Sequence, residues 1–129
     1  MGACYSVDLK VNVLDVPGAI KALNEHMIND TRSDYSLEEY AEQGITTETF
    51  DGVVKVLFAE LQQPVFIYQK GKFTVYTNAF NASYGWESIM MEWFKVLTPF
   101  VANGSQLLIY PDEGYDKLVV KNGKCVQIH

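Results

Sequence analysis

The sequence has few of the residues on which several kinds of site depend. Its 129 residues include two cysteines, Cys4 and Cys125, and a single arginine, Arg32. Two cysteines without metal-type spacing exclude a disulfide framework and a cysteine-based metal site. One arginine in a chain of net charge −6 argues against nucleic-acid binding, because phosphate and base recognition normally need a basic, arginine-bearing surface. We therefore expect no metal and no nucleic-acid partner.

Long hydrophobic runs and familiar catalytic motifs are also missing. No stretch approaches the 18 apolar residues that a membrane span requires, and the first residues lack the pattern of a signal peptide. These absences predict a cytoplasmic protein with no membrane partner. The sequence also has no glycine-rich phosphate loop and no H-E-x-x-H or G-x-S-x-G motif. We expect no cofactor.

Nucleophilic catalysis has only weak candidates. Cys4 and Cys125 both fall in the phase of their strands that is predicted to face away from the core, which would leave them accessible. The only histidines that would serve as a base are His26, on a predicted helix, and His129, at the end of the chain. Because nothing in the sequence orients either histidine, the sequence favours a protein that is not an enzyme.

The chain is rich in hydrophobic residues and in acidic residues. Hydrophobic residues make up 48% of it, enough for residues 1–129 to form a single globular domain. Residues 1–63 hold 11 acidic and four basic groups, so the negative charge lies in the first half. The segment 30–51 is the most acidic, and it predicts either a surface for a basic protein partner or simple solubility. The residues assigned to this acidic patch are Asp30, Asp34, Glu38, Glu39 and Glu42.

Hydrophobic periodicity divides the first half into one strand and three helices. Residues 5–13 alternate apolar and polar side chains, as a strand with one buried face does. A helix is predicted to begin at Pro17 and end near Asp30. Ser36 and Glu39 form a capping box for a short helix ending at Gly44, and a stronger apolar stripe predicts a helix from about Thr47 to Pro64.

The second half is richer in strands. Residues 65–68 and 73–76 flank Gln69–Lys72 and predict a hairpin. A long helix, capped by Ser83, is expected to end at Asn103–Gly104. Strands are then predicted at 106–110, 118–120 and 125–128, the last two joined by a turn at Asn122–Gly123.

This order of elements predicts an α+β fold. We expect a single-layer, mostly antiparallel sheet of about six strands with helices packed on one face. The first six elements resemble a ferredoxin-like (split βαβ) order, and a C-terminal β-hairpin follows them. The alternative is a purely antiparallel meander with the helices gathered on one side.

The later strands have apolar side chains at both odd and even positions, so both faces of the sheet are expected to be apolar there. We therefore expect another segment, chain or ligand to cover the face that the helices leave open. The predicted partner-binding residues on it are Phe66, Tyr68, Tyr76, Leu108 and Tyr110. Three coverings are open: the segment 31–44, a second copy of the chain in a homodimer, or a ligand. The sequence favours a non-enzymatic protein-binding or self-assembling module. The alternative is a small-molecule-binding protein or small enzyme with a pocket between this face and residues 31–44.

Overall fold

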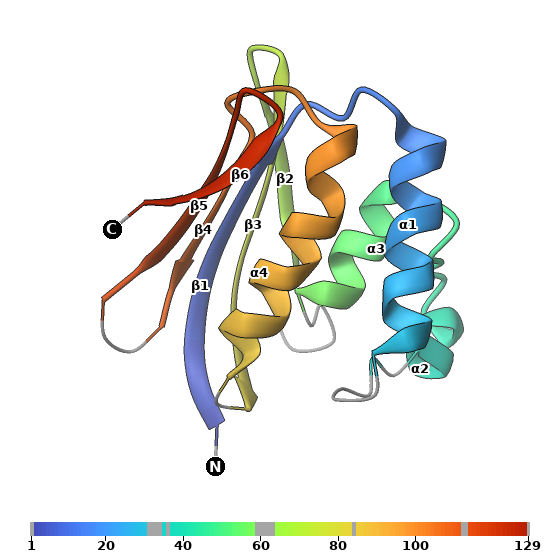
Figure 1. Cartoon of the computed structure of the whole chain (residues 1–129). Coiled ribbons are helices and arrows are strands. Elements are labelled where there is room, and N and C mark those ends of the chain that lie inside the picture. The colour runs from blue at the N-terminus through green and yellow to red at the C-terminus, as the bar shows by residue number, and fades with distance from the viewer. Residues whose placement is uncertain are drawn as a thin grey trace.

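The computed structural model describes residues 2–30, 35, 37–58, 64–83, 85–111 and 114–128. The described residues form a six-stranded antiparallel sheet and four helices, so the α+β prediction is confirmed (Figure 1). The strands are β1 (Gly2–Val11), β2 (Phe66–Lys70), β3 (Phe73–Ser83), β4 (Gln106–Tyr110), β5 (Asp116–Lys121) and β6 (Lys124–Ile128). The helices are α1 (Val16–Asn29), α2 (Leu37–Glu42), α3 (Phe50–Leu57) and α4 (Trp86–Leu97), followed by the 3₁₀ turn η1 (Thr98–Phe100).

The strand order is β2-β3-β1-β4-β5-β6, and each strand is antiparallel to its neighbours. The strand β1 therefore lies between β3 and β4, which run parallel to each other and are connected through α4. A meander would place consecutive strands side by side throughout, so the meander alternative is wrong. The C-terminal hairpin of β5 and β6 extends the sheet beyond β4, as expected.

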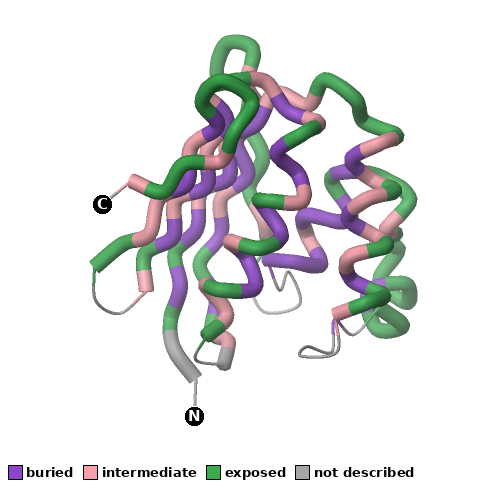
Figure 2. Tube along the Cα trace, viewed as in Figure 1, coloured by how far each residue is buried: buried purple, intermediate pink, exposed green. Residues whose placement is uncertain are grey.

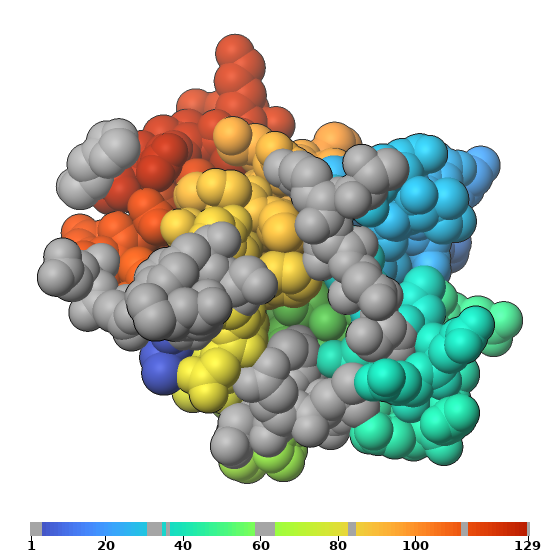
Figure 3. Space-filling model, turned by 90° about the horizontal axis from the view of Figure 1, so that it is seen from below, coloured from blue at the N-terminus to red at the C-terminus, as the bar shows by residue number. Residues whose placement is uncertain are grey.

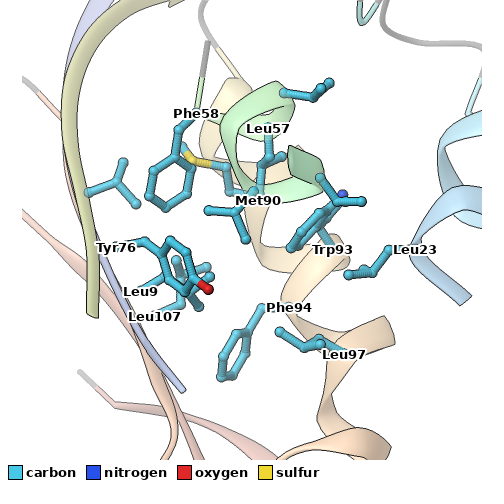
Figure 4. Packing of buried hydrophobic residues seen from close by; sticks show 14 of the residues in the cluster. Leu9, Leu23, Leu57, Phe58, Tyr76, Met90, Trp93, Phe94, Leu97 and Leu107 are labelled. Atoms are coloured by element: carbon cyan, nitrogen blue, oxygen red, sulfur yellow. The ribbon is translucent and has the colours of Figure 1, made fainter. Parts of the chain in front are cut away.

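Alternate side chains of β1 are buried, as the sequence predicted. Val7 and Leu9 are 0% and 1% exposed, whereas Asp8 and Lys10 between them are partly exposed. Figure 2 shows the same alternation across the neighbouring strands. In Figure 4 the buried Leu9, Tyr76 and Leu107 of the strands point toward Met90 and Phe94 of α4, and these five side chains belong to one hydrophobic cluster.

The helices begin where short side chains can satisfy free backbone N–H groups. Asp15 accepts a hydrogen bond from the Gly18 N–H at the start of α1, and Thr49 accepts one from Gly52 at the start of α3. The helix α4 forms as predicted, but its predicted N-cap was wrong, because Ser83 is the last residue of β3 and the N-cap is Gly85, with φ of 95° and no side-chain hydrogen bond. A residue with positive φ lets the chain reverse between strand and helix, and glycine adopts it without steric cost.

The helices α3 and α4 contribute many of the core side chains, which are Phe50, Val53, Val54, Val56 and Leu57 from α3 and Ile89, Met90, Trp93, Phe94 and Leu97 from α4. Trp93 and Phe94 are each 1% exposed and lie between the sheet and α1 (Figure 4). Leu23 of α1 and Leu107 of β4 approach them from the two sides (Figure 4). This packing accounts for the apolar stripe that predicted α4.

The acidic segment does not cover the sheet where the structure describes it. The helix α2 lies beside α1 and α3 (Figure 1), and Figure 3 shows it on the opposite side of α4 from β4, β5 and β6. Its Tyr40 is 3% exposed and belongs to the helix-side core. The remaining residues 31–34 and 36, including the predicted capping residue Ser36, lie outside the described residues.

Candidate interaction surface on the sheet

Strand register defines the face of the sheet opposite the core, which we call the outer face. Paired residues of adjacent strands point to the same side, so Asp8 shares a face with Thr77 and Leu108, its partners on β3 and β4. Phe66 pairs with Thr77, and Tyr68 pairs with Val75, which in turn pairs with Lys10. The outer face therefore includes four of the five residues predicted to bind a partner: Phe66, Tyr68, Leu108 and Tyr110.

Three of these four residues are substantially accessible to solvent. Phe66 is 67% exposed, Tyr68 is 52% exposed and Tyr110 is 44% exposed, while Leu108 is half-buried. Phe66 and Tyr68 lie on β2, at one edge of the sheet, and Tyr110 packs against Tyr115 with ring centroids 6.1 Å apart. No described segment covers these side chains. Exposed aromatic groups on one face are typical of an interaction surface.

Tyr76 does not belong to this surface, which corrects the prediction. It is 3% exposed and pairs with Leu9 on the core side of the sheet. The cause is the length of the hairpin turn: Lys70 pairs with Phe73, so only Gly71 and Lys72 lie between the strands. A two-residue turn places even-numbered residues of β2 opposite odd-numbered residues of β3. Tyr76 therefore shares a face with Ile67, and Val75 takes the outer position.

The centre of the outer face is polar. The strand β1 contributes the exposed Ser6 and the half-buried Asp8 and Lys10. The Lys10 ammonium lies 5.0 Å from the centroid of the Phe73 ring, a cation–π contact, and among the described residues Asp8 forms no ion pair. Apolar side chains flank this stripe on both sides, from β2 and β3 and from β4 to β6. By the same register Lys70, Lys117, Lys121 and Lys124 also lie on the outer face. Its described strand residues therefore include five lysines, counting Lys10, and one aspartate, Asp8.

The predicted acidic patch is only partly described. Glu38, Glu39 and Glu42 are exposed on α2, and Asp34 lies outside the described residues. Asp30 is half-buried at the end of α1, where its Oδ2 accepts a hydrogen bond of 2.9 Å from the Tyr35 hydroxyl. The three glutamates are therefore accessible to a partner. Asp30 instead forms a hydrogen bond that links the end of α1 to Tyr35.

The two cysteines lie on opposite faces of the sheet. Cys4 is exposed on the outer face, and its Sγ donates a hydrogen bond of 2.8 Å to Asn81 Oδ1. Cys125 pairs with the buried Val120 and is half-buried on the core side, which corrects the expectation that both thiols face away from the core. Burial raises the pKa of the Cys125 thiol, and Thr98 and Lys95 oppose this effect only in part.

Few of the described residues could act in acid–base catalysis or bind a metal ion. His26 is half-buried on α1, and its Nε2 has no hydrogen-bond partner among them. His129 lies outside the described residues. No group of three or more His, Cys, Asp or Glu side chains in the described ranges is placed to hold a metal ion. A site for catalysis is therefore not evident in this part of the chain.

A hydrogen bond between a tyrosine and a glutamate joins the sheet to α4. The Tyr5 hydroxyl donates to Glu87 Oε2 at 2.7 Å, linking β1 to the first turn of α4. Burial, aided by the Glu87 carboxylate, raises the pKa of Tyr5 to about 12. Neither sequence periodicity nor a motif indicated this contact, because its two residues are 82 positions apart.

The described helices include none that is long and apolar enough to cross a membrane. No protein-family model, curated protein or solved structure matches this chain.

Proposed function

We propose that this protein is a non-enzymatic, self-assembling module whose copies associate through the outer face of the sheet. The observation that carries this proposal is the exposure of Phe66, Tyr68 and Tyr110 on one face that no described segment covers. Burial of apolar area stabilises association by about 25 cal/mol for each Å² removed from water. Self-association through one shared patch normally closes as a two-fold dimer.

The strand order supports a further proposal about architecture. The parallel strands β3 and β4, with β1 between them and α4 connecting them, form the arrangement expected of a split βαβ unit. We take the fold to be ferredoxin-like, with the helices as a single layer on the core side. This arrangement leaves the outer face for a partner. The cytoplasmic location expected from the sequence stays a prediction.

Light scattering tests the proposed self-association. We expect the protein to have twice the mass of one chain at tens of micromolar, because a dimer with a dissociation constant of about 1 µM, or about −8 kcal/mol, is mostly associated there. Replacing Phe66 and Tyr68 together by serine should shift the molecule to a monomer. Leu14→Ser is the matched control, because Leu14 is 69% exposed and lies on the chain just before α1. A monomeric wild-type protein at these concentrations would overturn the proposal.

A second candidate function is recognition of a basic protein surface by α2. It is favoured by the exposure of Glu38, Glu39 and Glu42, three carboxylates on one short helix. Such an interaction should weaken as salt shortens the range of the electrostatic attraction. Binding of a model basic protein that is unchanged by the triple substitution of these glutamates to glutamine would count against it.

A further inference from the structure

The edge strand β2 is exposed on both of its faces. Its outer-face residues Phe66 and Tyr68 are 67% and 52% exposed, and Ile67, on the core side, is still 39% exposed. The described helices therefore leave the core side of this edge partly open. A partner stacked on the outer face would cover Phe66 and Tyr68 only. A strand paired along the edge of β2 would contact all three side chains, because its own side chains extend to both faces of the sheet.

The backbone of β2 also has hydrogen-bonding groups directed out of the sheet. Among the described residues, β2 has a neighbouring strand, β3, on one side alone. In a two-residue hairpin the residues that flank the turn form a hydrogen-bonded pair, here Lys70 with Phe73, and such pairs alternate along the ladder. The even-numbered residues of β2 thus direct their backbone groups to β3, whereas Ile67 and Gln69 direct theirs to the outside.

A hydrogen bond elsewhere in the sheet agrees with this phase. Alternation carried across the strand pairs from β2 predicts that odd-numbered residues of β4 bond to even-numbered residues of β5. At the start of this ladder the Val120 N–H donates a hydrogen bond of 2.9 Å to the carbonyl of Ser105. The sheet therefore has one consistent hydrogen-bonding phase, and it leaves Ile67 and Gln69 directed outward.

This edge is complementary to a second copy of itself. Two β2 strands that pair antiparallel about a two-fold axis at Ile67 place Ile67 opposite the partner's Ile67. Gln69 then pairs with the partner's Val65, the residue just before the strand, so both outward-directed positions of β2 are hydrogen-bonded. Phe66 lies directly opposite the partner's Tyr68, twice by symmetry, in the kind of pair that brings side chains closest. Aromatic residues opposite each other stabilise strand pairing.

Charge favours this register over its neighbours. Lys70 is the one charged residue of β2, and with the axis at Ile67 it lies about 20 Å from the partner's Lys70. With the axis at Gln69 the two lysines would be diagonal neighbours about 7–8 Å apart and would repel each other. With the axis at Tyr68, only Ile67 and Gln69 would exchange hydrogen bonds, which leaves Val65 without a partner in the strand.

The opposite edge of the sheet is less suited to pairing. On the outer face of β5 and β6, Lys121 pairs with Lys124, and Lys117 pairs with Ile128. Lysines along an edge hinder pairing with another strand. The strand β2 has its single lysine at the turn, and its first three residues, Phe66 to Tyr68, are apolar or aromatic.

We propose that β2 pairs antiparallel with β2 of a second copy about a two-fold axis at Ile67, which joins the two sheets into one continuous sheet. This inference rests on the proposed self-association and locates it at the β2 edge of the outer face. The axis is perpendicular to the sheet, so the two outer faces lie side by side and point the same way. Their lysines are therefore not stacked on one another, and Lys10 lies about 24 Å, or five strand spacings, from its copy.

Cross-linking tests the register. In a Cys4→Ser/Cys125→Ser background, residues of β2 are replaced by cysteine one at a time, and each variant is treated with a mild oxidant. Ile67→Cys should give the most covalent dimer, because the two Cα atoms would be about 5.5 Å apart, within the range that a disulfide spans. Gln69→Cys is the matched control on the same side of the strand. Its Cα atoms would be about 13 Å apart, so it should give about tenfold less dimer or lower.

Amide hydrogen exchange tests the edge in the wild-type protein, where no substitution can disturb folding. The amides of Ile67 and Gln69 should exchange about threefold more slowly, or slower still, at protein concentrations well above the dissociation constant than below it. The amide of Tyr68 is the internal control, because it is bonded to β3 in the single chain as well as in the dimer.

A charge at the axis provides an independent measurement. Ile67→Lys places two like charges opposite each other and should raise the dimer dissociation constant about tenfold or more. Ile28→Lys is the control and should leave the dissociation constant unchanged, because it makes the same change at a side chain of α1 that is 77% exposed.

The outcomes separate this inference from the proposed function. A wild-type monomer would overturn both. A wild-type dimer in which the Ile67 and Gln69 amides show no dependence on concentration would overturn the edge pairing and leave self-association standing. Cross-linking that is strongest at a residue other than Ile67 would overturn the register. Assemblies that grow beyond a dimer would also overturn it, because a two-fold pairing of β2 edges closes at two chains. Concentration-dependent protection of these two amides, together with strongest cross-linking at Ile67, would support it.

Discussion

The hydroxyl of Tyr76 donates a hydrogen bond of 2.5 Å to Oδ1 of Asp51, connecting the core side of β3 to the first turn of α3. The Phe50 ring meets the Tyr76 ring edge-on, with centroids 5.8 Å apart. Tyr76 is 3% exposed, while the Asp51 carboxylate is exposed to solvent. A buried donor is thus satisfied by the side chain of an exposed residue.

Removing this hydroxyl should destabilise the protein modestly. In Tyr76→Phe the ring keeps its packing, and because Asp51 is exposed, no buried polar group is left without a partner. We expect the free energy of unfolding to fall by about 1 kcal/mol, as for an ordinary hydrogen bond. Urea denaturation at neutral pH measures this change. A loss above about 3 kcal/mol would indicate that the hydroxyl does more than this single bond.

The two buried tyrosines should make stability fall at alkaline pH. Burial and a neighbouring carboxylate raise the pKa of Tyr5 from 10.0 to about 12, and burial beside Asp51 raises the pKa of Tyr76 as well. The folded state therefore holds these protons more tightly than the unfolded state. Their contribution is complete below pH 10 and is lost as the pH rises above it, for Tyr5 up to about 12.

Urea midpoints between pH 8 and pH 11 check this prediction, with the pH range chosen to cross the ordinary tyrosine pKa of about 10. We expect the midpoint to decline above pH 10 in the wild-type protein. The decline should be smaller in Tyr5→Phe, because only Tyr76 of these two tyrosines then remains to lose its proton more readily in the unfolded state. An equal decline in both proteins would contradict the assignment.

Gly52 should not tolerate a side chain. A Cβ at this position would overlap the carbonyl oxygen of Thr46, which belongs to the backbone and cannot rotate away. We expect Gly52→Ala to reduce the free energy of unfolding by at least about 2 kcal/mol, because the loop before α3 must shift. Gly44→Ala is a useful comparison, since a Cβ there meets no atom within 4 Å and only its φ of 81° opposes the change. Thermal denaturation of the two variants should rank them in this order.

The core on α4 should be sensitive to truncation. Phe94 is 1% exposed and lies between the sheet and the helical layer, so Phe94→Ala removes buried contacts and leaves a cavity. We expect a loss of about 3–5 kcal/mol in the free energy of unfolding. Leu14→Ala is the control, because a side chain that is 69% exposed should contribute within about 0.5 kcal/mol. Equal effects of the two changes would be inconsistent with the packing in Figure 4.

The two thiols should differ in reactivity. Cys4 is exposed, whereas Cys125 is half-buried and burial raises the pKa of its thiol. Because the thiolate is the reactive form, a disulfide reagent at neutral pH should modify one thiol quickly and the other slowly. Cys4→Ser should remove the fast phase and keep the slow one. In denaturant both thiols should react at the same rate, and a fast phase that survives Cys4→Ser in the folded protein would contradict this ranking.

Local sequence determined the elements and the turns that join them. Alternation along residues 5–13 gave the buried face of β1, and the stripe from Trp86 to Leu97 gave α4, because such patterns separate apolar from polar side chains within one element. The turn at Asn122–Gly123 was also predictable, since φ values of 52° and 74° favour these two residues. The exposed aromatics Phe66 and Tyr68 followed from the excess of apolar side chains in the strand that carries them.

Tertiary structure alone decided how these elements face one another. Tyr76 lies in the core because a two-residue turn sets the register of β2 and β3, and a shift of one residue would have exchanged its face. The positions of Lys10 beside Val75 and of Asp8 beside Leu108 depend on pairings between strands far apart in the chain. Likewise, Tyr40 fixes the short helix α2 to the rest of the molecule, because it is buried in the same cluster as Leu23 of α1 and Phe50 of α3. Periodicity within a segment carries no information on such long-range pairing, which depends on how all the buried surfaces fit together.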